Sequence, residues 1–272
     1  MERMATISPS QLRAMECRQQ WAWAYRDGYK ANRMGDALEL GIGIHEALEV
    51  YYKGEEDDPA GYFEKWFGIR GIDSEKMLKL GKAMLEGYVD HWYGKDEFDV
   101  LGTEKTIFRP LPVPYTDQVA ECSVVVRLDM LVRCHRTGKL FSLDHKTFSR
   151  FNSKDIENDQ QFTAQIWVGE TLTDGEPIVG VIYNGLRKQT PGPRVKLNLF
   201  ERRKTFRNQA QIDAFLLRAY FQYRDAKTWE IFPQPGSIKC NMCDFQAPCS
   251  EKQRGGDYEY LLQENYTKRG EK

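Results

Sequence analysis

Three residues whose side chains could act together on a phosphate group are Asp129, Asp144 and Lys146. Carboxylates and water are the ligands that Mg²⁺ prefers, and phosphate oxygens commonly complete its coordination shell. A lysine beside such a pair can neutralise a carboxylate, orient a water or stabilise an oxyanion. The same residues also fit a solvated strand face with Lys146 in a salt bridge, because Asp-x-Lys is a common tripeptide. Spacing alone leaves both interpretations open.

These residues lie in segment 124–148, where hydrophobic and polar residues alternate as in two antiparallel strands. If residues 135–138 form the turn, Asp129 faces Asp144, and if the turn is 137–138 only, Asp129 faces Lys146. Both registers place the three side chains on one face, whereas an odd loop without a bulge would separate them. Directly opposed like charges destabilise a hairpin. The hairpin therefore favours a bound divalent cation.

Four further polar residues are candidates for the same site. His45 and Leu38 share an apolar stripe of a predicted helix, where a lone histidine is either a core residue or a ligand. Gln161 and Gln165 share one face of another predicted helix. Buried amides need partners, here either a substrate phosphate or neighbouring backbone. Glu104 lies on a predicted strand before the hairpin and is either a surface residue or part of the site.

Four cysteines suggest a second site. Cys240, Cys243 and Cys249 are spaced as Cys-x2-Cys-x5-Cys, and Cys17 has no thiol near it in the sequence. If Cys17 meets the other three, the four thiolates suit zinc or an iron–sulfur cluster. Burial of cysteines that bind nothing is a third interpretation. The two remaining cysteines lie at the ends of a predicted strand and are expected to be core residues, Cys122 and Cys134.

The elements that must position these residues follow from hydrophobic periodicity and turn signals. A helix is expected over 8–30, with Ser8 or Ser10 as its cap and Pro9 in its first turn. Another begins near Asp36. Further helices are predicted at 59–70, 74–95, 156–173 and 203–226, and strands at 103–111, 122–134, 139–148 and 178–188. This order predicts an α/β or α+β fold around a mixed sheet.

Composition limits the classes of function. The formal net charge is −1, so nucleic-acid binding would need local basic patches such as 187–196 and 201–204, which are otherwise solvated faces. No apolar run approaches the roughly 20 residues that span a bilayer, and the first residues lack an apolar signal core. We expect a soluble intracellular protein with reduced thiols.

Six motifs in order resemble the PD-(D/E)XK nuclease superfamily. They are SPSQLRAMECRQQWAW, GIGIHEAL, RLDMLVR, LDHKT, QQFTAQIW and CNMCDFQAPC. More narrowly, the set is similar to the RecB-type branch with a four-cysteine iron–sulfur cluster, which includes the AddB nuclease domain, CRISPR-associated RecB-like exonucleases and related phage proteins. The likeness covers residues 8–249, nearly the whole chain.

The resemblance implies a role for each matching position. His45, Asp129, Asp144 and the backbone carbonyl of His145 would hold one or two Mg²⁺ or Mn²⁺ ions. Asp144 and Lys146 would form the (D/E)xK pair. Two further matches are an upstream acidic residue and the first residue of the family's Gln-x3-Tyr motif, Glu104 and Gln161. The ligands of a [4Fe-4S] cluster, or of zinc in its place, would be Cys17, Cys240, Cys243 and Cys249.

The sequence departs from the family pattern at two places. Gln165 stands where the helix motif has tyrosine, which puts that motif's substrate role in doubt, and the glycine often found before the motif aspartate is absent. Neither departure removes a metal ligand. No G-x4-G-K-[ST] motif occurs, so the chain carries no helicase motor motif of its own.

The function that the resemblance implies is a Mg²⁺- or Mn²⁺-dependent deoxyribonuclease, most simply an exonuclease of DNA repair or recombination. Its fold would be a restriction-endonuclease-like α/β core, a central mixed sheet flanked by helices, in one nuclease domain over 1–272. Residues 1–35 and 228–255 would form a cluster-binding appendage, and 256–272 a polar tail. Expected partners are single-stranded DNA or DNA with free ends and recombination or CRISPR-type proteins, in the cytoplasm of a bacterial or phage-infected cell. The alternatives are an inactive nuclease fold that binds DNA and a zinc-stapled version of the fold.

Overall fold

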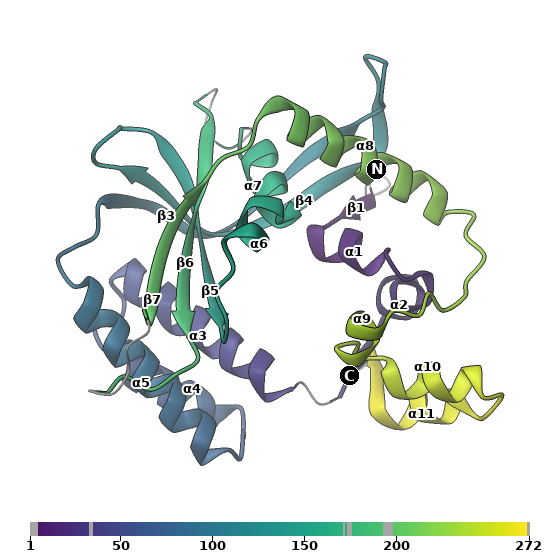
Figure 1. Cartoon of the computed structure of the whole chain (residues 1–272), viewed down its shortest axis with the longest axis horizontal. Coiled ribbons are helices and arrows are strands. Elements are labelled where there is room, and N and C mark those ends of the chain that lie inside the picture. Colours follow the sequence, from purple (N-terminus) through teal and green to yellow (C-terminus); the bar gives the residue numbers. More distant parts are fainter. Residues whose placement is uncertain (1–4, 33–34, 171, 173–175, 193–197, 271–272) are drawn as a thin grey trace. The chain divides into compact units, whose positions relative to one another are not determined.

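The computed structural model describes residues 5–32, 35–170, 172, 176–192 and 198–270 (Figure 1). The chain divides into two compact units that we describe separately. Unit 1 comprises 1–34, 110–124 and 216–272, and unit 2 comprises 35–109 and 125–215. In the described part of the chain, no helix is both long enough and apolar enough to cross a membrane.

Unit 2 is built on a mixed sheet, as predicted. Its strands follow the order β4 (Val119–Cys134), β5 (Leu140–Phe148), β6 (Ile178–Arg187) and β7 (Phe200–Thr205), and β3 (Phe98–Pro112) also pairs with β4. The β4–β5 and β6–β7 pairs are antiparallel, whereas β5 and β6 are parallel. The prediction of helix from residue 203 was wrong, because Thr205 pairs with Val181 in the sheet and helix α8 (Gln209–Ala226) begins later.

Two helices pack against one face of this sheet, near the lower ends of β5–β7 in the view of Figure 1, and a third helix packs on those two. The predicted helices are confirmed as α3 (Asp36–Lys53), α4 (Pro59–Ile69) and α5 (Glu75–Trp92). The predicted apolar stripe of α3 was partly wrong, because Leu38 is 51% exposed. The face of α3 that joins the core instead contains Leu40, Ile44, Ala47 and Leu48.

The other face of the sheet is covered by α6 (Ser153–Asn158) and α7 (Gln160–Gly169). We predicted one helix over 156–173, but Asp159 interrupts it with an extended backbone, and its side chain accepts a hydrogen bond from Gln161 N as the cap of α7. Residues 171 and 173 of the predicted helix lie outside the described residues. The cap fixes the start of the helix that carries both glutamines.

The first segment of unit 1 is a broken helix rather than the continuous one predicted over 8–30. Strand β1 (Ala5–Ile7) pairs in parallel with the start of β4, and α1 (Pro9–Ala14), α2 (Arg18–Trp21) and η1 (Ala22–Arg26) follow. Ser8 caps α1, and Pro9 begins it, as predicted. Cys17 has an extended backbone, φ −131° and ψ 111°, and precedes α2. Cys17 therefore lies at a helix break and not within a helix.

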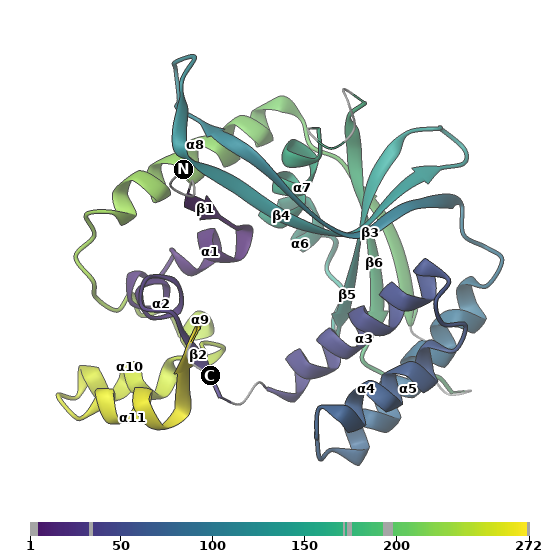
Figure 2. The same ribbon diagram turned by 180° about the vertical axis from the view of Figure 1, so that it is seen from behind.

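The C-terminal segment of unit 1 is also structured. It contains α9 (Ser237–Asn241), α10 (Gln246–Gln253), α11 (Tyr258–Asn265) and β8 (Tyr266–Lys268). Strand β8 pairs antiparallel with β2 (Tyr29–Ala31), which joins residues far apart in the sequence (Figure 2). The segment expected to be a polar tail therefore contributes a helix and a strand.

Candidate active site

The β4–β5 hairpin fixes the relation between the two aspartates. Residues 135–138 form the turn, in which Gly138 N donates to Cys134 O at 2.8 Å. Met130 pairs with Leu143 in the hairpin. The observed register is thus the four-residue-turn alternative. The next residue beyond the Met130–Leu143 pair is an aspartate on each strand, Asp129 and Asp144, and the two carboxyl groups lie close enough to repel each other.

Asp129 is almost buried, with 12% of its side chain exposed. Its Oδ2 accepts a hydrogen bond from His145 N at 2.7 Å and lies 3.3 Å from His45 Nδ1. Burial, followed by repulsion from Asp144, raises the pKa of the Asp129 carboxyl. The structure therefore brings His45 of α3, with 29% of its side chain exposed, directly to the hairpin.

Asp144 is fully buried, and two amides hold one of its carboxylate oxygens. Gln161 Nε2 and Gln165 Nε2 each donate to Asp144 Oδ1 at 2.8 Å. Gln165 Oε1 in turn accepts from Ser142 Oγ at 3.2 Å, a contact that sequence reasoning missed. The only sequence signal for Ser142 was its place on the same strand face as Asp144. The side-chain amides of Gln161 and Gln165 are thus paired with the Asp144 carboxylate and with side chains next to it on β5.

Lys146 faces the other oxygen of the same carboxylate. Its Nζ lies 2.7 Å from Asp144 Oδ2 and donates to Gln161 Oε1 at 3.2 Å. Burial acts to lower the pKa of Lys146, but the Asp144 carboxylate outweighs burial and raises that pKa. Lys146 is therefore held as an ammonium beside the carboxylate pair.

Glu104 joins this group from strand β3. Burial, followed by repulsion from Asp129, raises the pKa of Glu104 to about 7. The Glu104 backbone has φ 49°, in the left-handed region that residues other than glycine rarely adopt. Such a conformation destabilises the fold locally and is found most often at functional sites. Arg127 forms an ion pair with Glu104. This partner was missed, although Arg127 shares the predicted strand face with Asp129.

The donor atoms suit a hard divalent cation, because they are mainly carboxylate oxygens. Burial and then repulsion from a neighbouring carboxylate raise the pKa values of Asp129 and Glu104, and a divalent cation would favour the charged form of both. As placed, the described residues contain no group of three or more His, Cys, Asp or Glu side chains arranged to hold a metal ion. The types of these side chains therefore suit a divalent metal ion, but their positions do not form a complete coordination shell.

The four candidate cysteines line one cavity of about 110 Å³ in unit 1, beside Trp23. None of the four is in a disulfide. Burial, together with nearby groups that include the Cys17 and Cys249 thiols, raises the pKa of Cys243 to about 11. The two cysteines expected to be core residues, Cys122 and Cys134, are buried and do not line this cavity.

Contacts around this cavity join segments from the two ends of the sequence. Arg18 N donates to Gln234 Oε1 at 2.8 Å, and Lys252 Nζ donates to Gln19 Oε1 at 2.8 Å. Aromatic rings of the same unit, including Trp23 and Phe245, pack beside the cavity. A bound group would thus add to an existing set of contacts.

The two basic segments are not simply solvated faces. Arg187 Nη1 donates to Ser149 O at 2.8 Å, and Arg202 is buried among polar partners. Arg194 and Lys196 lie outside the described residues. Most of the described basic residues here thus have partners within the protein.

Comparisons with known proteins agree with this fold. The sequence model of the PD-(D/E)XK nuclease superfamily matches residues 6–250. No curated protein matches the chain. A crystal structure from Eubacterium rectale, described as a "Putative exonuclease", is similar over 90% of this chain and 88% of that chain, with 12% identity and a TM-score of 0.52.

The family match covers most of the chain, including the hairpin and the three C-terminal cysteines. The structural likeness, at low identity, supports the same fold. This chain belongs to the PD-(D/E)XK nuclease superfamily.

Proposed function

We propose that the protein is a Mg²⁺- or Mn²⁺-dependent deoxyribonuclease that digests DNA from free ends. The observation that carries the proposal is the approach of Asp129 and Asp144 just beyond the last hairpin pair, Met130 and Leu143, with Lys146 Nζ 2.7 Å from Asp144 Oδ2. Family membership supports phosphodiester hydrolysis, and the described exonuclease neighbour supports action at ends.

In this proposal His45, Asp129, Asp144 and the carbonyl of His145 hold the metal, with Glu104 as a further carboxylate. A bound divalent cation lowers the pKa of a coordinated water and offsets charge at the scissile phosphate. Gln161 and Gln165 fix Asp144 Oδ1, so Oδ2, the oxygen beside Lys146, is the one left to serve as a ligand.

Lys146 positions the attacking water and neutralises charge that develops on the phosphate. Its raised pKa keeps it an ammonium at neutral pH, so it acts as a hydrogen-bond donor in the resting site. If Asp144 Oδ2 bound a metal ion, its hold on this ammonium would weaken, and Lys146 would then be available to orient a water.

We further propose that Cys17, Cys240, Cys243 and Cys249 hold a [4Fe-4S] cluster, with zinc as the alternative occupant. Four free thiols lining one cavity support this assignment. A group bound there would tie the segment around Cys17 to the C-terminal helices of unit 1. Its role would be structural.

The test is digestion of end-labelled linear DNA and of closed circular DNA by anaerobically purified protein. We expect linear DNA to be degraded with Mn²⁺ or Mg²⁺ and to stay intact with EDTA, because the site needs a cation to offset its carboxylates. The Asp144→Asn variant should lose at least about 100-fold of this activity, within the range of losses for a group essential to catalysis.

The controls separate this function from its rivals. Cleavage of circular DNA would show that the protein is an endonuclease and not an exonuclease. Equal activity of wild type and Asp144→Asn would identify a contaminant. DNA binding without cleavage in the presence of either metal would establish the inactive DNA-binding module instead.

A further inference from the structure

A row of polar side chains crosses three strands of unit 2 on the sheet face opposite Asp144. The register pairs His145 of β5 with Asn184 of β6, and Asn184 with Arg202 of β7. His145 and Asn184 are buried, and 11% of the Arg202 side chain is exposed. Alternation along β5 explains the placement, since Asp144 meets Gln165 of α7 while the His145 ring stacks on Tyr52 of α3. We call His145, Asn184 and Arg202 the ladder.

Hydrogen bonds in the ladder fix the orientation of each member. Arg202 Nε donates to Asn184 Oδ1 at 2.9 Å, and a guanidinium can only donate. The Asn184 amide nitrogen must therefore face the other way, where it donates to His145 Nδ1 at 2.7 Å and to Tyr88 OH at 2.9 Å. His145 Nδ1 is thus an acceptor, and the proton of the neutral ring sits on Nε2.

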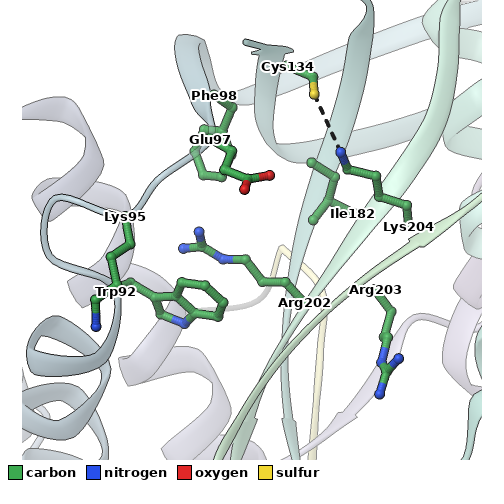
Figure 3. A pocket seen from close by; sticks show the side chains of 9 residues that line it. All are labelled: Trp92, Lys95, Glu97, Phe98, Cys134, Ile182, Arg202, Arg203 and Lys204. Atoms are coloured by element: carbon green, nitrogen blue, oxygen red, sulfur yellow. Dashed lines mark hydrogen bonds between the residues drawn. The ribbon is translucent and has the colours of Figure 1, made fainter. Parts of the chain in front are cut away.

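The outer end of the ladder is anchored by four groups. Arg202 donates to Asp96 Oδ1 at 2.5 Å and to the hydroxyls of Tyr52 and Tyr88 at 2.9 Å each. Its guanidinium lies 3.8 Å from the ring centre of Trp92, and Figure 3 shows it extending from β7 to that ring. Each anchor comes from α3, α5 or the segment between α5 and β3. Arg202 is therefore a rigid starting point for the ladder.

We infer that Asn184 and Arg202 are positioning residues of the active site, acting through His145. The His145 ring is held on one face, while its backbone N–H binds Asp129 and its neighbours Asp144 and Lys146 point to the other face. Fixing the ring therefore fixes the strand segment that presents the proposed metal ligands. This inference rests on the proposed metal-dependent nuclease function.

The expected effect is on metal binding before turnover. Groups that orient metal ligands without touching the metal typically affect metal affinity or activity about 10–100-fold when removed. Loss of the Asn184 amide releases the His145 ring and lets β5 shift relative to β4. The Asp129 and Asp144 carboxylates would then be less well placed to share a cation.

The main experiment compares wild type with Asn184→Leu, which keeps similar volume and removes the hydrogen bonds of the amide. Mn²⁺ binding to DNA-free protein is measured by calorimetry, and cleavage of linear DNA is measured over a Mn²⁺ titration. We expect Mn²⁺ binding at least about 10-fold weaker in Asn184→Leu, with a smaller loss of rate at saturating Mn²⁺. The matched control, Leu85→Ala, empties core volume on α5 without touching a polar atom of the ladder, and should keep wild-type Mn²⁺ affinity.

Two further measurements test the inference if Asn184→Leu does not fold. Arg202→Lys keeps the charge beside Asp96 but loses the planar fork, and it should bind Mn²⁺ more weakly than wild type. Nitrogen-15 NMR of metal-free wild type should show His145 protonated on Nε2. Protonation on Nδ1, wild-type Mn²⁺ affinity in both ladder variants, or equal weakening in Leu85→Ala would overturn the inference. Wild type that neither binds Mn²⁺ nor cleaves DNA would overturn the proposed function itself, whatever the NMR shows.

Discussion

At the scale of single residues, Asp129 and Glu104 are held in surroundings that disfavour their charged forms. Burial and mutual repulsion raise the pKa of Asp129 and of Glu104, the latter to about 7. A carboxyl whose pKa is higher in the folded than in the unfolded state stabilises the fold below its unfolded pKa. That stabilisation is lost as pH rises through the folded pKa. Metal-free protein should therefore lose stability between mildly acidic pH and pH 8.

Substitution of Asp129 by Asn tests this directly. Asp129→Asn removes the charge and keeps the shape, so the melting temperature of metal-free protein should rise at pH 8. For a chain of this size, a gain of 1 kcal/mol corresponds to about 2–4 °C. At pH 5 the gain should be smaller, because the wild-type carboxyls are then largely protonated. Differential scanning fluorimetry in EDTA measures both values.

The control for Asp129→Asn is Mn²⁺ itself. A ligand that binds only the folded state raises its stability, so Mn²⁺ should stabilise wild type at pH 8 and stabilise Asp129→Asn much less. A larger gain for the variant at pH 5 than at pH 8 would contradict the direction of the pKa shifts.

Sequence reasoning identified the charged residues but not the contacts that orient them. Asp129, Asp144 and Lys146 were found because hairpin periodicity restricts their faces. The two amides on Asp144 were not foreseeable, because their partner depends on how α7 docks against the sheet. Asn184 gave only the weak signal of a polar residue within an apolar strand.

At the scale of elements, α3 carries His45, and its approach to α4 depends on one glycine. A Cβ at Gly43 would lie 2.5 Å from a Phe63 ring carbon, closer than atoms can pack. A Cβ at Gly41 in the same helix would meet nothing closer than Thr147 Oγ1 at 3.6 Å. Only Gly43 is therefore needed for the close packing of α3 on α4, although both glycines weaken the helix.

The paired variants Gly43→Ala and Gly41→Ala should shift stability in opposite directions. Gly43→Ala should destabilise by about 1–3 kcal/mol, the usual cost of overpacking a core. Gly41→Ala should stabilise by up to about 1 kcal/mol, since alanine favours helix. Urea unfolding measures both. Equal effects of the two substitutions would show that Phe63 moves aside easily.

Elements with a clear hydrophobic periodicity were predicted well, whereas elements whose structure depends on tertiary contacts were not. The helices α3, α4 and α5 and the β4–β5 hairpin were predicted within a few residues. Strand β7 was not predicted, and its second half, from residue 203, was predicted as helix, because its charged residues show no strand pattern. Arg202 is buried by its partners, and Arg203 pairs with Glu201. The break at Cys17 has neither glycine nor proline to mark it.

At the scale of the whole molecule, unit 1 is assembled from three separate segments of the chain. The segments near Cys17 and Cys240 are already joined without any bound group, because Arg18 bonds to Gln234 and Lys252 bonds to Gln19. A cluster on the four thiols would add covalent links to this non-covalent set. If the proposed cluster is bound, unit 1 should depend on it for stability more than unit 2 does.

Replacement of one cluster ligand tests this structural role. Cys240→Ser should abolish the visible absorption of anaerobically purified protein and lower its melting temperature, because one of the four thiolates is lost. Absorption spectroscopy and thermal unfolding measure the two effects. Wild-type melting behaviour in Cys240→Ser would contradict a structural cluster.

The matched control is Cys122→Ala, which removes a buried thiol of the same unit that does not line the cavity. This variant should keep the visible absorption of wild type even if the emptied volume lowers its stability. A tightly bound zinc ion and no visible absorption in wild type would assign the site to zinc.

The division of the chain has a consequence for its synthesis on the ribosome. Every segment of unit 2 has been made once residue 215 is complete, whereas unit 1 must wait for its segment 216–272. At about 5–20 residues per second, Cys17 emerges on the order of 10–50 s before its three partner thiols. During that interval the nascent chain carries only one of the four thiols of the proposed site, so a four-thiolate group could be bound only after segment 240–249 has also been made.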